Sequence, residues 1–316
     1  MYNFSLFTIK EEKLARNRVQ KKNNEDLMKD QAKKFLIFSK NLFFAFCAAM
    51  LIKIFFIETS RVPTPSMEKT ILVGDFLFVN KIVYGISTPR TIPFTDIRLP
   101  YYQFPSFSEP EKKDIVVFEY PGDKDELLPG IVNNYVKRCI GEPGDTIQII
   151  DKVVFVNGEE FYRPPNIQYL RQGTLPAGYP VRDIFPKGAE WNQDNYGPLY
   201  IPKKGDTVWV SPSNIEKWRT IIDREFGRRV VTISGDKIKI DGQLADYYVL
   251  QDDYYFMMGD NRDDSADSRY WGFVPRRNIM GEALMIYWSW NSNIPVTSFF
   301  KLLSSVRLDR IAKIVH

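Results

Sequence analysis

A long apolar segment near the amino terminus most limits what this chain can fold into. Residues 35–57 are predominantly apolar and are interrupted by Lys40, Asn41 and Lys53. The segment is close to the roughly 20 residues that an α-helix needs to cross a bilayer. Both lysines lie towards its ends, where a long side chain can reach the membrane interface. We therefore expect residues 35–57 to form a single transmembrane helix.

The competing interpretation of this segment is a cleaved signal peptide. Its uninterrupted apolar run, residues 42–52, has the length of a signal-peptide core. However, the 34 residues before the segment are too many for the start of a signal peptide, and no small-x-small cleavage site follows closely. A retained anchor is the favoured interpretation.

The residues before the anchor form a basic tail. Residues 1–34 carry nine Lys and Arg against five acids, a composition typical of a solvated segment that can be helical. Because basic residues beside a membrane segment favour the cytoplasm, we expect a cytoplasmic amino terminus. Residues 58–316 would then form an extracytoplasmic domain.

The rest of the chain has the pattern of antiparallel β-structure. Asn157-Gly158 and Asp241-Gly242 each stand between β-like runs and predict hairpin turns. Loops are expected at 88–110 and over much of 162–202, and helices at 215–226 and 299–315. Short apolar runs bounded by turn residues predict strands at 75–79, 114–118, 135–140, 146–150, 153–156 and 207–210. The predicted fold class is mainly β, with one amino-terminal transmembrane helix.

Composition argues against several kinds of site. The only histidine, His316, is the last residue, where chains are usually frayed, so a Ser-His-Asp triad is not expected. Cys47 lies in the apolar segment, away from Cys139, which argues against a disulfide and a zinc site. The acids after Asp260 lack EF-hand spacing, and a net charge of +4 argues against nucleic acid. We expect no metal and no cofactor.

Two short stretches carry candidate chemistry. Ser66 lies in a proline-stiffened loop, Pro63-Thr64-Pro65-Ser66-Met67, although a serine there is by itself more often part of a linker. Lys137 lies within a predicted strand, where the structural alternative is an exposed edge-strand lysine. Lysine replaces histidine in Ser-Lys peptidases, provided that burial lowers its pKa well below about 10.4.

A third stretch, Gly259 to Arg269, completes a pattern of ordered blocks. Together with the Ser66 loop, the Asp114–Phe118 run and the Tyr135–Asp145 block, it resembles the bacterial type I signal peptidases, or leader peptidases. The matched blocks cover about 60–120, 134–150 and 254–290. Residues 157–250 match least and are expected to form an inserted second β region of the catalytic domain.

The resemblance implies catalytic roles for individual residues. Ser66 would be the nucleophile and Lys137 the general base, with the Ser265 hydroxyl orienting the lysine amine. The Ser66 backbone N–H and the Thr64 hydroxyl would form the oxyanion hole. Many members have Ser and Gly where this chain has Thr64 and Pro65, and many begin with two membrane segments rather than one.

The resemblance also implies supporting and substrate-binding residues. Asp267 and Arg269 would pair and, with Gly259, support the 259–269 loop. Six residues would line shallow pockets for small substrate residues: Val62, Met67, Ile71, Val117, Tyr135 and Val136.

The implied function is a membrane-bound serine endopeptidase of the bacterial inner membrane. Its partners would be the lipid bilayer and signal-peptide-bearing preproteins, cut after small residues at Ala-x-Ala sites. Two alternatives stay open. One is a related Ser-Lys peptidase that matures other surface proteins, and the other is an inactive, membrane-tethered β-domain that binds exported chains.

Overall fold

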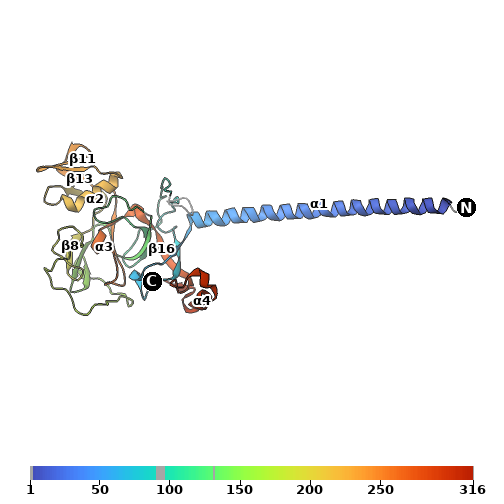
Figure 1. Cartoon of the computed structure of the whole chain (residues 1–316). Coiled ribbons are helices and arrows are strands. Elements are labelled where there is room, and N and C mark those ends of the chain that lie inside the picture. Colours follow the sequence, from blue (N-terminus) through green and yellow to red (C-terminus); the bar gives the residue numbers. More distant parts are fainter. Residues whose placement is uncertain (1–2, 90–96, 131, 316) are drawn as a thin grey trace. The chain divides into compact units, whose positions relative to one another are not determined.

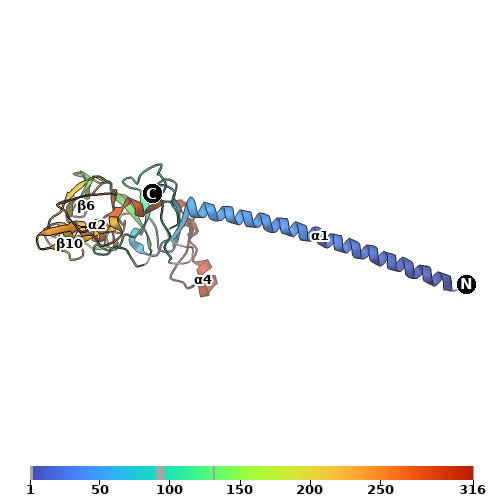
Figure 2. The same ribbon diagram turned by 90° about the horizontal axis from the view of Figure 1, so that it is seen from above.

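The computed structural model describes residues 3–89, 97–130 and 132–315. The chain divides into two compact units, residues 1–53 and 54–316. Helix α1 (Asn3–Phe55) makes up the first unit and extends two residues into the second, and it runs without interruption through the expected tail and most of the expected anchor (Figures 1 and 2). Within it, Met28–Lys53 is long and apolar enough to cross a membrane.

Helix α1 ends two residues before the expected end of the anchor. Ile57 already belongs to β1 (Ile57–Arg61), where it pairs with Asn80 of β2 (Asp75–Asn80). Antiparallel pairing of the β1 backbone therefore sets the carboxyl end of the helix.

One large antiparallel sheet organises the second unit. Its order is β1, β2, β16 (Ile279–Ser289), β3 (Ile115–Glu119), β4 (Asn134–Gly141), β14 (Tyr254–Met258) and β15 (Val274–Pro275). Strand β17 (Lys313–Ile314) also pairs with β16. These strands confirm the runs expected at 75–79, 114–118 and 135–140, and the fold class is mainly β.

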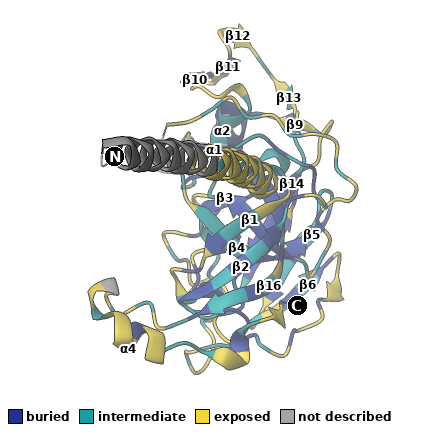
Figure 3. Cartoon of the chain, turned by 90° about the vertical axis from the view of Figure 1, so that its right-hand side faces the viewer, coloured by how far each residue is buried: buried dark blue, intermediate teal, exposed yellow. Residues whose placement is uncertain are grey.

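Strand β3 shows why its run is apolar at every position. Ile115 and Val117 belong to one core cluster, whereas Val116 and Phe118 belong to another. Because successive side chains of a strand point to opposite faces, a strand covered on both faces needs no polar alternation. Figure 3 shows the buried residues concentrated in this sheet.

A second, smaller sheet contains β7 (Glu159–Glu160), β6 (Val153–Val156), β5 (Thr146–Ile150) and β8 (Tyr196–Tyr200). The expected hairpin turn at Asn157-Gly158 joins β6 to β7. Its φ angles of 54° and 84° are those of a type I′ turn, for which Asn-Gly is favoured. Strand β8 is the regular element within the expected loop at 162–202.

The remaining elements within residues 157–250 are short. β9 (Thr207–Trp209) pairs with β13 (Tyr247–Val249), and β10 (Val231–Ser234), β11 (Lys237–Ile240) and β12 (Gln243–Leu244) form a three-stranded sheet beside α2 (Ile215–Phe226). Asp241-Gly242 joins β11 to β12, as expected. Figures 1 and 2 place this region at one end of the second unit and α4 (Phe299–Ser304) at the other.

The helix expected at 299–315 is wrong beyond Ser304. A 3₁₀ turn, Leu308–Arg310, and strand β17 follow α4. The buried Arg310 guanidinium donates from Nη2 to Asp75 Oδ2 at 2.6 Å. The backbone of β17 pairs with β16. These contacts outweigh local helix propensity, which is a weak determinant in a folded domain. Of the loop expected at 88–110, residues 90–96 lie outside the described residues.

Candidate active site

Lys137 lies on a central strand of the large sheet. Strand β4 is paired with β3 on one side, where Lys137 is opposite Val116, and with β14 on the other. The side chain is only 3% exposed. The alternative of an exposed edge-strand lysine is therefore wrong.

The environment of Lys137 disfavours its charged form. Burial lowers the pKa of its ammonium group from 10.5 to about 8, and the nearby Arg269 guanidinium acts in the same direction. The carboxylates of Asp267, Asp260 and Asp264 oppose this change. A substantial neutral fraction near neutral pH would allow this amine to accept a proton.

Ser66 lies in a short, closed loop after β1. Reciprocal backbone hydrogen bonds join the loop ends, from Val62 N to Asp75 O and from Gly74 N to Val62 O, at 2.9 and 3.0 Å. Pro65 begins a 3₁₀ turn, Pro65–Met67, which buries Ser66 and leaves it 7% exposed. The proline fixes φ at the first position of this turn.

Thr64 precedes this turn in an extended conformation. Its Oγ1 is 3.4 Å from Ser66 Oγ, and the threonine is exposed. The structure thus brings the Thr64 hydroxyl next to the Ser66 hydroxyl at the surface of the domain.

The 259–269 loop is bound to the Ser66 loop. The Asn261 backbone N–H donates to Ser66 O at 3.0 Å, and its Nδ2 donates to Pro65 O at 3.1 Å. Gly259 packs against both Ser66 and Ser265, because a Cβ on Gly259 would be 2.5 Å from Ser66 O and 2.2 Å from Ser265 Oγ. Only glycine fits between them.

Ser265 of this loop has a buried hydroxyl group that makes no hydrogen bond within the described residues. The residue is 7% exposed. A buried polar atom of this kind calls for a reason.

Asp267 and Arg269 form a buried ion pair, with Arg269 Nη2 to Asp267 Oδ2 at 2.9 Å. Asp267 Oδ2 also accepts from Gly259 N at 3.1 Å, and Arg269 Nη2 donates to Arg262 O at 2.6 Å. Burial opposes ionisation of Asp267, but Arg269 outweighs it and lowers the pKa of this carboxyl. The pair therefore ties both ends of the loop together.

A pocket of about 270 Å³ runs between these elements, with Ser66 and Lys137 both in its wall. Four of the expected substrate-binding residues line it, namely Val62, Met67, Tyr135 and Val136. Ile71 and Val117 do not line it but are fully buried in the core cluster that contains Val62 and Met67.

Sequence reasoning missed the residues that join Lys137's strand to the Ser66 loop. Asp260 accepts from Arg138 at 2.9 and 2.8 Å and from Thr70 Oγ1 at 2.6 Å. The position of Arg138 directly after Lys137 was the only available signal, because an internal arginine in a central strand needs a buried partner. The pocket wall also includes Arg61, Pro63, Asn134, Asp264 and Ala266, none of which was expected. His316 lies outside the described residues.

Comparisons with known proteins identify the family of this chain. The family model described as signal peptidase, peptidase S26, matches residues 35–288. A signal peptidase I of Rickettsia canadensis is 32% identical over 283 residues, covering 86% of this chain and 90% of that protein. A signal peptidase I of Pseudomonas aeruginosa is 30% identical, covering 88% and 80%.

A crystal structure of a signal peptidase I from Enterococcus faecalis aligns with 56% of this chain and 98% of its own, at 20% identity and a TM-score of 0.26. The family model and the relatives each cover more than two thirds of the present sequence. On these matches, the chain belongs to the signal peptidase family of serine peptidases, peptidase S26.

Proposed function

We propose that this protein is a membrane-bound endopeptidase that removes N-terminal signal peptides from exported preproteins with a Ser66–Lys137 dyad. The observation that carries the proposal is a buried lysine with a pKa of about 8 in the same pocket wall as a serine. The family of the chain supplies the substrate class, and the names of its relatives agree with it.

The first half of the reaction forms an acyl-enzyme. Neutral Lys137 Nζ accepts the proton of Ser66 Oγ while this oxygen attacks the carbonyl carbon before the scissile bond. Collapse of the tetrahedral intermediate breaks the C–N bond. The departing amine takes the proton from the Lys137 ammonium group, leaving the substrate acyl group as an ester on Ser66.

In the second half of the reaction, water hydrolyses the acyl-enzyme. Lys137 accepts a proton from a water molecule as the water oxygen attacks the ester carbonyl. The proton then returns to Ser66 Oγ as the acid product leaves. In both halves the oxyanion would be stabilised by the Ser66 backbone N–H and the Thr64 hydroxyl. Support for Thr64 comes from its hydroxyl oxygen, 3.4 Å from Ser66 Oγ.

Three further residues would position the dyad. The Ser265 hydroxyl would accept from or donate to the Lys137 amine and so orient it. The Asp267–Arg269 pair would hold the loop that carries Ser265, an assignment supported by its burial and by the bond from Gly259 N.

Specificity for small residues would come from the pocket itself. Val62, Met67, Tyr135 and Val136 line part of a pocket of about 270 Å³. Several substrate residues would share this space, so that each position would accept an alanine side chain and reject larger ones by steric overlap. A preprotein with an Ala-x-Ala site should therefore be cut. The same preprotein with phenylalanine directly before the cut should not.

The membrane arrangement is part of the proposal. The apolar stretch Met28–Lys53 of α1 would span the bacterial inner membrane once, with the basic residues before it in the cytoplasm. Protease added to the outer face should then degrade residues 58–316 and spare the amino-terminal tail. Protection of the large domain would contradict this orientation.

The dyad is tested with purified full-length protein and one preprotein. Ser66→Ala and Lys137→Ala should each lower kcat/KM by about 100- to 10,000-fold. The kcat/KM of the double variant should be little lower than that of either single variant, because the two residues act as a unit. Ser234→Ala and Lys237→Ala, at exposed positions on β10 and β11, are matched controls. Near-normal cleavage by Lys137→Ala would contradict the assignment of Lys137 as the general base.

A further inference from the structure

A second cavity, of about 340 Å³, lies behind the 259–269 loop. Its volume is within the range of small-molecule sites in proteins, roughly 300–1,000 Å³. Three cationic side chains line it, Lys152, Arg163 and Arg262, and the buried side chains Val154, Phe161 and Ile167 form an apolar part of the wall.

Arg262 is the unusual residue of this cavity. It is 2% exposed, and its Nε donates to Gly259 O at 3.1 Å. Within the part of the chain that the structure describes, its two terminal nitrogens make no hydrogen bond or ion pair. Charged groups are rarely buried without a partner, because desolvation strongly disfavours them.

The nearby carboxylates are already committed elsewhere. Asp260 is bound by Arg138, and Asp267 is bound by Arg269. The carboxylates in the cavity wall itself, Asp151 and Glu160, belong to exposed residues. The terminal nitrogens of Arg262 thus present an open fork to the cavity, a geometry that binds carboxylate and phosphate through two parallel hydrogen bonds.

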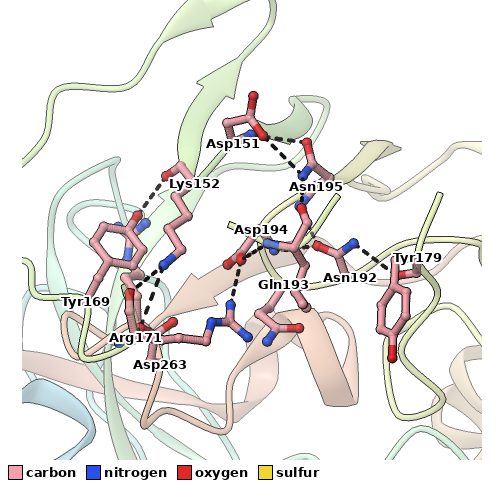
Figure 4. A network of polar contacts seen from close by, with 12 residues as sticks. Asp151, Lys152, Tyr169, Arg171, Tyr179, Asn192, Gln193, Asp194, Asn195 and Asp263 are labelled. Atoms are coloured by element: carbon pink, nitrogen blue, oxygen red, sulfur yellow. Dashed lines mark hydrogen bonds and ion pairs between the residues drawn. The ribbon is translucent and has the colours of Figure 1, made fainter. Parts of the chain in front are cut away.

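The cations beside Arg262 are held in place around Tyr169. Lys152 Nζ lies 4.9 Å and the Arg163 guanidinium carbon 5.3 Å from the centre of the Tyr169 ring. Lys152 Nζ also donates to Arg171 O at 3.0 Å and is 3.9 Å from Asp263 Oδ2 (Figure 4). The positive charge of Lys152 is therefore only partly offset, because its one carboxylate contact in this network, with Asp263, is long.

The wall segments are themselves fastened to the loop. Arg171 N donates to Asp263 Oδ2 at 2.8 Å, and Arg171 Nη2 bonds to Asp194 Oδ2 (Figure 4). Gln168 exchanges backbone hydrogen bonds with Asp260 and Arg262, each at 3.0 Å. Hydrogen bonds therefore hold the wall segments that carry Lys152 and Arg262, whereas Arg163 is exposed and contacts the Tyr169 ring.

We propose that this cavity binds a small organic oxyanion. Its carboxylate or phosphate group would lie on Arg262, with Lys152 and Arg163 adding positive charge, and a compact apolar body would contact Val154, Phe161 and Ile167. Because Arg262 holds Gly259 O, occupancy should stabilise the fold. The site does not depend on the proposed dyad, so binding can be measured on a Ser66→Ala protein.

The test is a titration of the full-length Ser66→Ala protein in detergent at constant ionic strength. Inorganic phosphate, acetate and hexanoate are the free anions, and micelles containing phosphatidylglycerol supply a lipid headgroup. Calorimetry should give saturable binding, and the anion should raise the melting temperature. Hexanoate should bind more tightly than acetate, because it also buries apolar surface. Competition by the doped micelles would identify a headgroup as the source, and its absence a free anion.

Variants made in the Ser66→Ala protein locate the site. Arg262→Lys should weaken binding roughly tenfold by losing the planar fork, and Arg163→Ala should weaken it less. Arg182→Ala, at an exposed position outside the cavity wall, should bind normally. If Arg262→Lys does not fold, Thr174→Phe serves instead, because it fills the cavity from an exposed wall position. The site would be overturned if no saturable binding is found. It would also be overturned if Thr174→Phe and Arg163→Ala both bind the anion as tightly as the Ser66→Ala parent protein does.

Discussion

The α-carbon of Gly259 faces the Ser265 hydroxyl so closely that a methyl group on it would be 2.2 Å from Ser265 Oγ. The same methyl group would be 2.5 Å from the backbone oxygen of Ser66. Rotation of the Ser265 side chain cannot relieve this second contact, because it involves the backbone, and the added carbon would also be 2.7 Å from Ser265 Cβ. The absence of a side chain at Gly259 therefore allows the 259–269 loop to lie this close to the Ser66 loop.

Gly259→Ala should consequently lose most activity while the domain stays folded. Displacing a positioned catalytic group by about 1 Å can cost on the order of 100-fold in rate. Gly130→Ala, at an exposed position with no atom within 4 Å of the added carbon and no positive φ, controls for general effects of replacing glycine. A Gly259→Ala enzyme with kcat close to wild type would show that this spacing is unimportant for catalysis.

The proposed role of Lys137 as general base predicts a pH dependence of cleavage. A lysine can act as a base only when neutral, and burial lowers the pKa of Lys137 to about 8. The value of kcat/KM should therefore rise as pH increases through about 8 and level off above it. Steady-state assays from pH 6 to 9.5, with circular dichroism to confirm folding, measure this; a flat profile would argue against Lys137 as the base.

The same pKa predicts a cost to stability. Because folding lowers the lysine pKa from 10.5 to about 8, the folded state is penalised wherever the unfolded lysine is protonated. The penalty is fully present below pH 8 and vanishes above about 10.5. Lys137→Met should thus be more stable than wild type at pH 7 by up to roughly 3 kcal/mol. Denaturation at pH 7 and pH 10 tests this, since only the pH-dependent part of the difference reports on the charge.

Thr64 is predicted to donate to the oxyanion. Thr64→Val keeps β-branching but removes the hydroxyl, and losing one such donor typically lowers kcat by about 100- to 1,000-fold. KM should change little, because the bond forms chiefly in the transition state. Thr64→Ser should keep most activity. Cleavage by Thr64→Val within about threefold of wild type, against that expectation, would remove Thr64 from the mechanism.

The buried Arg138–Asp260 pair should dominate the stability of the site. Asp260→Ala removes the carboxylate that Arg138 binds and so breaks a buried ion pair, which typically costs about 3–5 kcal/mol, and it also removes the acceptor of Thr70 Oγ1. Arg228→Ala breaks a pair whose side chains are 59% and 50% exposed and should cost less than about 1 kcal/mol. Urea unfolding of both variants compares them directly, and equal losses would contradict the role given to Asp260.

Local pattern was enough to predict strands β2 to β6, β9 and helix α2, but it did not predict β1, β14 or β16 of the large sheet. The runs at 75–79 and 135–140 and the helix at 215–226 were recognisable because side-chain periodicity and turn residues act over a few positions. Asn157-Gly158 and Asp241-Gly242 defined hairpins because few other pairs adopt two positive φ angles easily. The apolar stretch within α1 was equally plain from composition. Ser66 and Lys137 came from their motif blocks, not from periodicity.

Tertiary structure decided the features that depend on residues far apart in the chain. Arg138 and Asp260 are 122 positions apart, and their pairing sets how the strand of Lys137 meets the Ser66 loop. Arg310 ends the expected carboxyl-terminal helix by binding Asp75, 235 positions away. Sequence determined which residues can form strands, turns and a nucleophile loop, because those preferences are local. The burial that lowers the pKa of Lys137, and the open fork of Arg262, arise only when distant segments exclude water together.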